Sequence, residues 1–101
     1  HPQYGLARKQ MKAGSGIITL ELNAGLSECL EFCKKLKLFT MAESLGGIES
    51  LICHPATMTH ASVAKDVREA VGIGDSLIRL SVGIESSHDL INDLASGLAA
   101  L

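Results

Sequence analysis

Residues 77–85 read LIRLSVGIE, and alternate residues of this stretch differ in character. This pattern limits the possible folds, because it fits a strand with two unlike faces. One face carries only apolar side chains: Ile78, Leu80, Val82 and Ile84. The other carries Leu77, Arg79, Ser81 and Gly83. The first face is typical of a hydrophobic core. On the second face, the long side chain of Arg79 is followed by the small residues Ser81 and Gly83. This pattern predicts space next to Arg79 in which a ligand can be bound.

Short strand-like and helix-like segments fill the rest of the chain. Runs rich in β-branched and apolar residues predict three more strands, over 17–22, 38–43 and 49–53. Apolar residues at helical spacing predict four helices: about 2–11, 26–36 after a cap at Asn23 or Ser27, 63–71 between Ser62 and Gly72, and 90–101 after Ser86 or Ser87. The order α-β-α-β-β-α-β-α predicts an α+β two-layer sandwich, with a four-stranded, mostly antiparallel sheet and helices packed on one side.

The helices are expected to contact the sheet through apolar stripes. These stripes are Leu26, Cys29, Leu30, Cys33 and Leu36; Val63, Val67, Ala70 and Val71; and Leu90, Ile91, Leu94, Leu98 and Leu101. The opposite face of the sheet is expected to be partly free or covered by a partner.

Length and composition favour one domain and exclude several functional classes. The chain has 101 residues, 47% of them hydrophobic, and a net charge of −2. Without a basic excess, and with only 3% aromatic residues, it offers no nucleic-acid surface. No apolar run is long enough for a membrane span, and no signal-peptide pattern opens the chain. Because the chain starts at His1, already inside a predicted helix, we interpret it as part of a longer protein.

The residues that most often do chemistry have plain structural interpretations here. Cys29 and Cys33 lie one helical turn apart, but both belong to the apolar stripe, and no second pair completes a metal site. Together with Cys53 they are expected to be reduced core thiols of a cytosolic protein. His54 and His60 flank a loop with no nucleophile beside them, so a surface or structural role is expected for both.

Two features keep a binding interpretation open. The stretch AESLGGIES, residues 42–50, has more glycine than a simple turn needs, and backbone N–H groups in such a turn can hold a carboxylate or a phosphate. Arg79 can present a bidentate fork to a carboxylate. The alternatives are a solvated loop, and an arginine that is exposed or paired with Glu43 or Glu85.

Three motifs in order resemble one enzyme family. LKLFTMAESLGGIESL, HPATMTHASV and LIRLSVGIESSHDLINDL, with the opening HPQYGLARKQM, are similar to the carboxy-terminal domain of the pyridoxal-phosphate enzymes of cysteine and methionine metabolism. The resemblance covers essentially residues 1–101. It implies the small domain of a cytoplasmic, homotetrameric transsulfuration enzyme of the cystathionine γ-synthase or γ-lyase type. The implied substrates are cystathionine or an O-acylated homoserine.

The resemblance also implies roles for particular residues. Arg79 matches the arginine that holds the substrate α-carboxylate, Ser44 matches its serine partner with Leu45 behind it, and Glu43 matches the position that helps separate family members. A glutamate there is typical of γ-synthases and γ-lyases. Thr59 matches a threonine near the cofactor pocket.

The cofactor and the chemistry are expected to need the rest of the enzyme. The family's Schiff-base lysine and phosphate-binding residues belong to a large domain that precedes these residues, so this chain alone is expected to bind no pyridoxal phosphate and to catalyse nothing. Loss of the Arg79 contact is expected to cost on the order of 3 kcal/mol in kcat/KM. Two alternatives stay open: a free-standing module that binds an amino acid at Arg79 and Gly46–Gly47, and an assembly domain in which Arg79 forms an interfacial ion pair.

Overall fold

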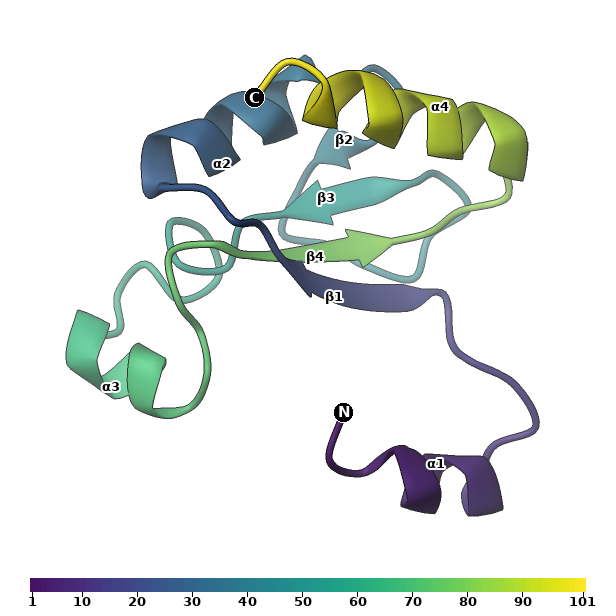
Figure 1. The fold of residues 1–101 in the computed structure, drawn as a ribbon, viewed down its shortest axis with the longest axis horizontal. Helices are drawn as coiled ribbons and strands as arrows, with labels where there is room; N and C mark the ends of the chain where they lie inside the picture. The colour runs from purple at the N-terminus through teal and green to yellow at the C-terminus, as the bar shows by residue number, and fades with distance from the viewer.

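The computed structural model describes residues 1–101 and contains four helices and four strands in the predicted order. They are α1 (Tyr4–Gln10), β1 (Ile17–Glu21), α2 (Leu26–Lys35), β2 (Thr40–Met41), β3 (Leu51–Cys53), α3 (Lys65–Ala70), β4 (Leu77–Ser81) and α4 (Ser87–Leu98). The α+β sandwich is confirmed. Figure 1 shows α2 and α4 along one side of the sheet, while α1 and α3 lie at the opposite end of the molecule.

The sheet has the strand order β1-β4-β3-β2, with β4 at its centre beside β3. β4 pairs antiparallel with β1, where Arg79 faces Thr19, and antiparallel with β3, where Arg79 faces Cys53. β2 pairs with β3 in parallel, so the sheet is mixed and mostly antiparallel. Because β4 lies between two partners, both of its backbone edges are hydrogen-bonded, which gives the residue at its middle a fixed backbone position.

The core lies between the sheet and the helix pair. Its nine buried residues are Cys29, Phe32, Cys33, Leu36, Phe39, Ile52, Ile78, Leu80 and Leu90. Alternation therefore predicts the inward residues of β4 correctly at Ile78 and Leu80 but not at Ile84, which is 81% exposed because the strand ends at Ser81. The three cysteines are buried and free, as predicted for core thiols.

Several predicted helix boundaries and faces are wrong. Gly25, not Asn23 or Ser27, is the N-cap of α2, and its N–H donates to the Glu28 carboxylate at 2.7 Å. Ala64, not Ser62, precedes α3. The Ser86 cap of α4 is confirmed, with its hydroxyl accepting from the N–H of Asp89.

The expected apolar stripes of α3 and α4 are only partly buried. In α3 the one buried side chain is Arg68, whose guanidinium pairs with Asp75 at 2.5 Å, whereas Val67 is exposed. In α4 the buried residues are Leu90, Asp93 and Gly97. Of the other residues in the predicted stripe, Leu94 is partly buried against the core, and three are exposed: Ile91, Leu98 and Leu101. None of the helices has the length and apolar character of a membrane span.

Candidate functional site

Arg79 projects from the sheet face opposite the core, because its strand neighbours Ile78 and Leu80 point inward. The guanidinium Nη2 donates to two backbone carbonyls, those of Glu43 and Ser44, both at 3.1 Å. Its Nε is buried and has no hydrogen-bond partner. None of the four ion pairs in the structure involves Arg79. The alternative in which Arg79 pairs with Glu43 or Glu85 is therefore wrong for this chain.

The space predicted beside Arg79 is partly filled by the chain's own loop. The segment 43–49 runs across β4, and the Gly46 N–H donates to the Ser81 hydroxyl at 2.8 Å. Gly46 has a φ of 77°, a left-handed conformation that favours glycine. Since its N–H is engaged with Ser81, it is not available to a ligand. The small side chain at position 81 therefore accommodates a turn of the chain itself.

The predicted site residues Glu43, Ser44 and Leu45 lie beside Arg79 at the surface. All three are exposed, and the Glu43 carboxylate forms no ion pair. The Ser44 hydroxyl forms no hydrogen bond within the chain, while the Ser44 carbonyl supports Arg79. The arrangement is a guanidinium held from one side by carbonyls, with a free hydroxyl on the supporting segment. This guanidinium can bind a carboxylate without first breaking an ion pair.

Thr59 is hydrogen-bonded to a different part of the chain. It is exposed in the loop after β3, and its hydroxyl is 2.8 Å from the His60 Nδ1. No hydrogen bond links it to Arg79 or to the segment 43–49. His54 in the same loop is fully buried, with Nδ1 2.8 Å from the Thr57 hydroxyl and Nε2 2.8 Å from the Asp75 carbonyl. Both ring nitrogens are therefore used to hold the loop, which is the structural role expected for His54.

Sequence reasoning missed a second cluster of polar groups next to the segment 43–49. Ser50 is fully buried, and its N–H and hydroxyl both donate to the Glu85 carboxylate at 2.8 Å. These hydrogen bonds from Ser50 lower the pKa of Glu85. The only sequence signals were a serine just before an apolar strand and a glutamate two residues after Gly83, and neither identifies its partner 35 positions away.

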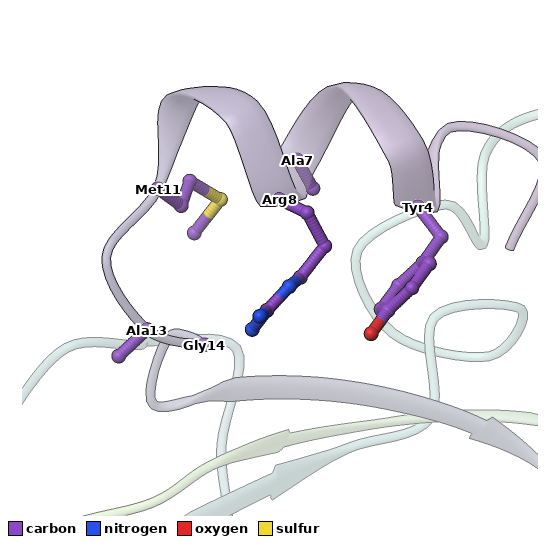
Figure 2. A pocket seen from close by; sticks show the side chains of 6 residues that line it. All are labelled: Tyr4, Ala7, Arg8, Met11, Ala13 and Gly14. Carbon is purple, nitrogen blue, oxygen red and sulfur yellow. The ribbon is translucent and has the colours of Figure 1, made fainter.

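Two hollows in the surface are built from other residues. A pocket of about 240 Å³ lies between α1 and the following segment, lined by Tyr4, Ala7, Arg8, Met11, Ala13 and Gly14. Figure 2 shows Tyr4 and Arg8 of α1, and Met11 just after it, pointing toward the side on which Ala13 and Gly14 lie. An apolar groove of about 190 Å³ lies between β1, β4 and α4. Neither hollow includes Arg79 or the segment 43–49.

None of the six lysines is hydrogen-bonded to Arg79 or to the segment 43–49. All six lysine side chains are exposed, and three of them have partners within the chain: Glu31 for Lys34, the Ala100 carbonyl for Lys35, and Asp75 for Lys65. The hydrogen bond that Lys65 donates to the Asp75 carboxylate raises the pKa of Lys65, whereas imine chemistry requires a desolvated lysine that loses its proton easily. None of the six lysines therefore has the buried setting that favours imine chemistry.

Comparison with known proteins gives concordant matches over almost the whole chain. The family model described as "Cys/Met metabolism PLP-dependent enzyme" matches residues 1–99. A cystathionine β-lyase of Coxiella burnetii is 52% identical over 98 residues, which are 97% of this chain and 25% of that protein. A cystathionine γ-lyase of Macaca fascicularis is 53% identical over 100 residues, 99% of this chain and 25% of that protein.

The solved structures agree. The crystal structure of cystathionine γ-synthase from Xanthomonas oryzae pv. oryzae in complex with cystathionine matches with a TM-score of 0.90 and 49% identity, over 98% of this chain and 26% of that one. The same enzyme in complex with aminoacrylate and cysteine matches equally well. This chain thus spans about a quarter of the length of the relatives that it matches.

Proposed function

This chain belongs to the Cys/Met metabolism PLP-dependent enzyme family, and we propose that its 101 residues are the C-terminal small domain of a transsulfuration enzyme and hold the substrate α-carboxylate. The proposed substrates are cystathionine or an O-acylated homoserine, and the enzyme is of the cystathionine γ-synthase or γ-lyase type. It serves methionine and cysteine metabolism in the cytoplasm as a homotetramer. Support comes from relatives that are cystathionine lyases and from a structural neighbour in complex with cystathionine.

The observation that carries the proposal is the unpaired guanidinium of Arg79. Its Nη2 is held by two carbonyls, its Nε has no partner, and no carboxylate of the chain neutralises it. An arginine mounted at the middle of a central strand has little freedom, so it can orient a carboxylate. In this proposal Arg79 binds the α-carboxylate, the Ser44 hydroxyl adds a hydrogen bond, and Leu45 and Glu43 line the site.

Pyridoxal phosphate supplies an electron sink for substrate carbanions when it is bound, and we assign its binding to the rest of the enzyme. Thr59 is proposed to lie near its pocket. The isolated 101 residues are proposed to bind no cofactor and to be inactive. Three apolar side chains beside the carboxylate clamp (Arg79 with the segment 43–49) are exposed: Leu45 at 54%, Ile48 at 72% and Ile84 at 81%. Their exposure supports a partner that covers this surface. We assign this cover to the enzyme's own large domain or to a neighbouring subunit.

The test compares arginine variants in the longest natural chain that contains these residues. Arg79→Lys is expected to lower kcat/KM for cystathionine by about 100-fold, because a point charge replaces a bidentate fork. Arg8→Lys, at an exposed arginine without an ion-pair partner, is the matched control and is expected to change little. Unchanged turnover in Arg79→Lys, with an altered oligomer mass, would assign Arg79 to assembly instead.

Two further measurements separate the enzyme from a binding module. The native protein is expected to have a mass several times that of this chain and a visible absorption that borohydride bleaches. Tight binding of a free amino acid by the isolated 101 residues would contradict the proposal and favour the amino-acid-binding module.

A further inference from the structure

The segment 43–49 has to stay fixed for Arg79 to stay fixed, because its carbonyls are the guanidinium's only hydrogen-bond partners. The segment itself contains no helix or strand. It is attached to β4 by the bond from Gly46 to Ser81 and, at its other end, by the Ile84 N–H, which donates to the Ile48 carbonyl at 2.9 Å. The position of this far end therefore depends on the residues that follow β4.

Ser50 and Glu85 join the far end of the segment to the chain after β4. The Ser50 N–H and hydroxyl donate to the two Glu85 carboxylate oxygens, and the same hydroxyl accepts from the Gly83 N–H at 2.9 Å. Every polar group of Ser50 is thus used, since its carbonyl accepts from the Thr40 N–H at 3.0 Å. One buried serine links the ends of β2, β3 and β4.

The Glu85 carboxylate accepts hydrogen bonds from Ser50 and forms no ion pair with a cation. None of the ion pairs of the structure includes Glu85, although the hydrogen bonds from Ser50 favour its charged form by lowering its pKa. A side chain at position 83 would come within 2.6 Å of the carboxylate oxygen Oε2. The carboxylate is therefore packed against the backbone that it holds.

We propose that Ser50 and Glu85 are a positioning pair, which holds the segment 43–49 at the distance from β4 that the Arg79 guanidinium needs to bind the substrate carboxylate. This inference rests on the proposed function of Arg79. Neither residue of the pair is hydrogen-bonded or ion-paired to Arg79, so the effect passes through the backbone of the segment. Loss of the pair lets the Glu43 and Ser44 carbonyls move, and the guanidinium loses the support that orients it.

The test measures carboxylate recognition separately from turnover, in the longest natural chain. L-Alanine and L-alaninamide are used as competitive inhibitors of cystathionine turnover, and the ratio of their inhibition constants reports how well a carboxylate is distinguished from an amide. Glu85→Ala is expected to lower that ratio about tenfold, in line with the loss of charge-assisted hydrogen bonds, with kcat changed about twofold or less. Glu85→Gln, which keeps an acceptor for the Ser50 N–H, is expected to restore most of it.

The matched control removes a carboxylate of similar structural importance on the helix side of the sheet. Asp93→Ala takes away the acceptor of three backbone N–H groups and is expected to lower stability without changing the inhibition ratio. Ser50→Ala breaks the hydroxyl bonds while keeping the carboxylate, and it supplies the measurement if Glu85→Ala does not fold. Its inhibition ratio is expected to fall as well.

The outcomes separate the two proposals. If Arg79→Lys leaves the inhibition ratio unchanged, the carboxylate clamp itself is wrong. If Arg79→Lys lowers the ratio while Glu85→Ala and Ser50→Ala behave like Asp93→Ala, the clamp stands and the positioning pair is overturned. A fall of the ratio in all three clamp-side variants, with recovery in Glu85→Gln, supports both.

Discussion

Gly97 of α4 lies against Phe32 of α2, and the two helices approach so closely that a Cβ at position 97 would be 3.0 Å from the Phe32 ring atom Cε2. The same Cβ would be 2.7 Å from Cδ2 of Leu36. Phe32 is 1% exposed and belongs to the core, so its ring has little freedom to move away. A glycine inside a helix, normally unfavourable, is used here for close helix packing.

Gly97→Ala is expected to destabilise the helix pair. Alanine improves helix propensity by about 1 kcal/mol, but overpacking costs about 1–3 kcal/mol, so a net loss of about 1 kcal/mol is expected. Hydrogen exchange of the α4 backbone amides measures the free energy of opening of this helix in the variant and in the wild-type protein. Gly5→Ala is the control, because a Cβ at that helical position meets nothing within 4 Å. A more stable α4 in Gly97→Ala would show that the helices separate at no cost.

Acid is expected to weaken the junction between α4 and β2. The Asp93 carboxylate accepts from the N–H groups of Lys37 and Leu38, both at 2.9 Å, and of Phe39 at 3.3 Å. Although burial alone would raise the pKa of Asp93, these bonds lower it below its ordinary value. A lowered carboxyl pKa stabilises the fold above the ordinary value near 4, and this stabilisation is lost as the pH falls through the folded-state pKa.

The control for this pH effect is Asp93→Asn, since Asp75 and Glu85 also have lowered pKa values and contribute to the acid sensitivity of the whole chain. The difference in opening free energy between the wild-type protein and Asp93→Asn is expected to be constant above about pH 5 and to shrink below about pH 4. Exchange rates are corrected for the intrinsic rate at each pH. A difference that does not depend on pH would mean that the charge of Asp93 is unimportant.

The order of the elements could be predicted because periods of two and of 3.6 residues are local signals. The same alternation correctly separated Arg79 from the buried Ile78 and Leu80. Boundaries were less predictable, since they depend on which backbone groups find partners. The start of α2 at Leu26, for instance, follows from the bond between the Gly25 N–H and Glu28, which competes with two nearby residues of better capping type.

The partners of Arg79 could not be read from the chain. Its guanidinium bonds to carbonyls 35 and 36 positions away, and every residue offers a carbonyl, so no side-chain type marks the contact. The parallel pairing of β2 with β3 was hidden for a similar reason, because strand direction is set by the path of the loop between the strands. The family motifs predicted the role of Arg79, and the structure identified the carbonyls that support it.

Gly83→Ala is expected to weaken carboxylate binding at Arg79 by displacing residues 48 and 49 at the end of the supporting segment. A Cβ there would be 2.7 Å from the Glu49 carbonyl carbon and would also clash with the Ile48 carbonyl oxygen, so the segment 43–49 must shift. We expect about a tenfold loss of kcat/KM for cystathionine and a loss of stability of about 2 kcal/mol, typical of overpacking. Gly47→Ala is the control within the same segment, because its Cβ meets nothing within 4 Å. Equal activity of the two variants would show that the end of the segment moves without disturbing Arg79.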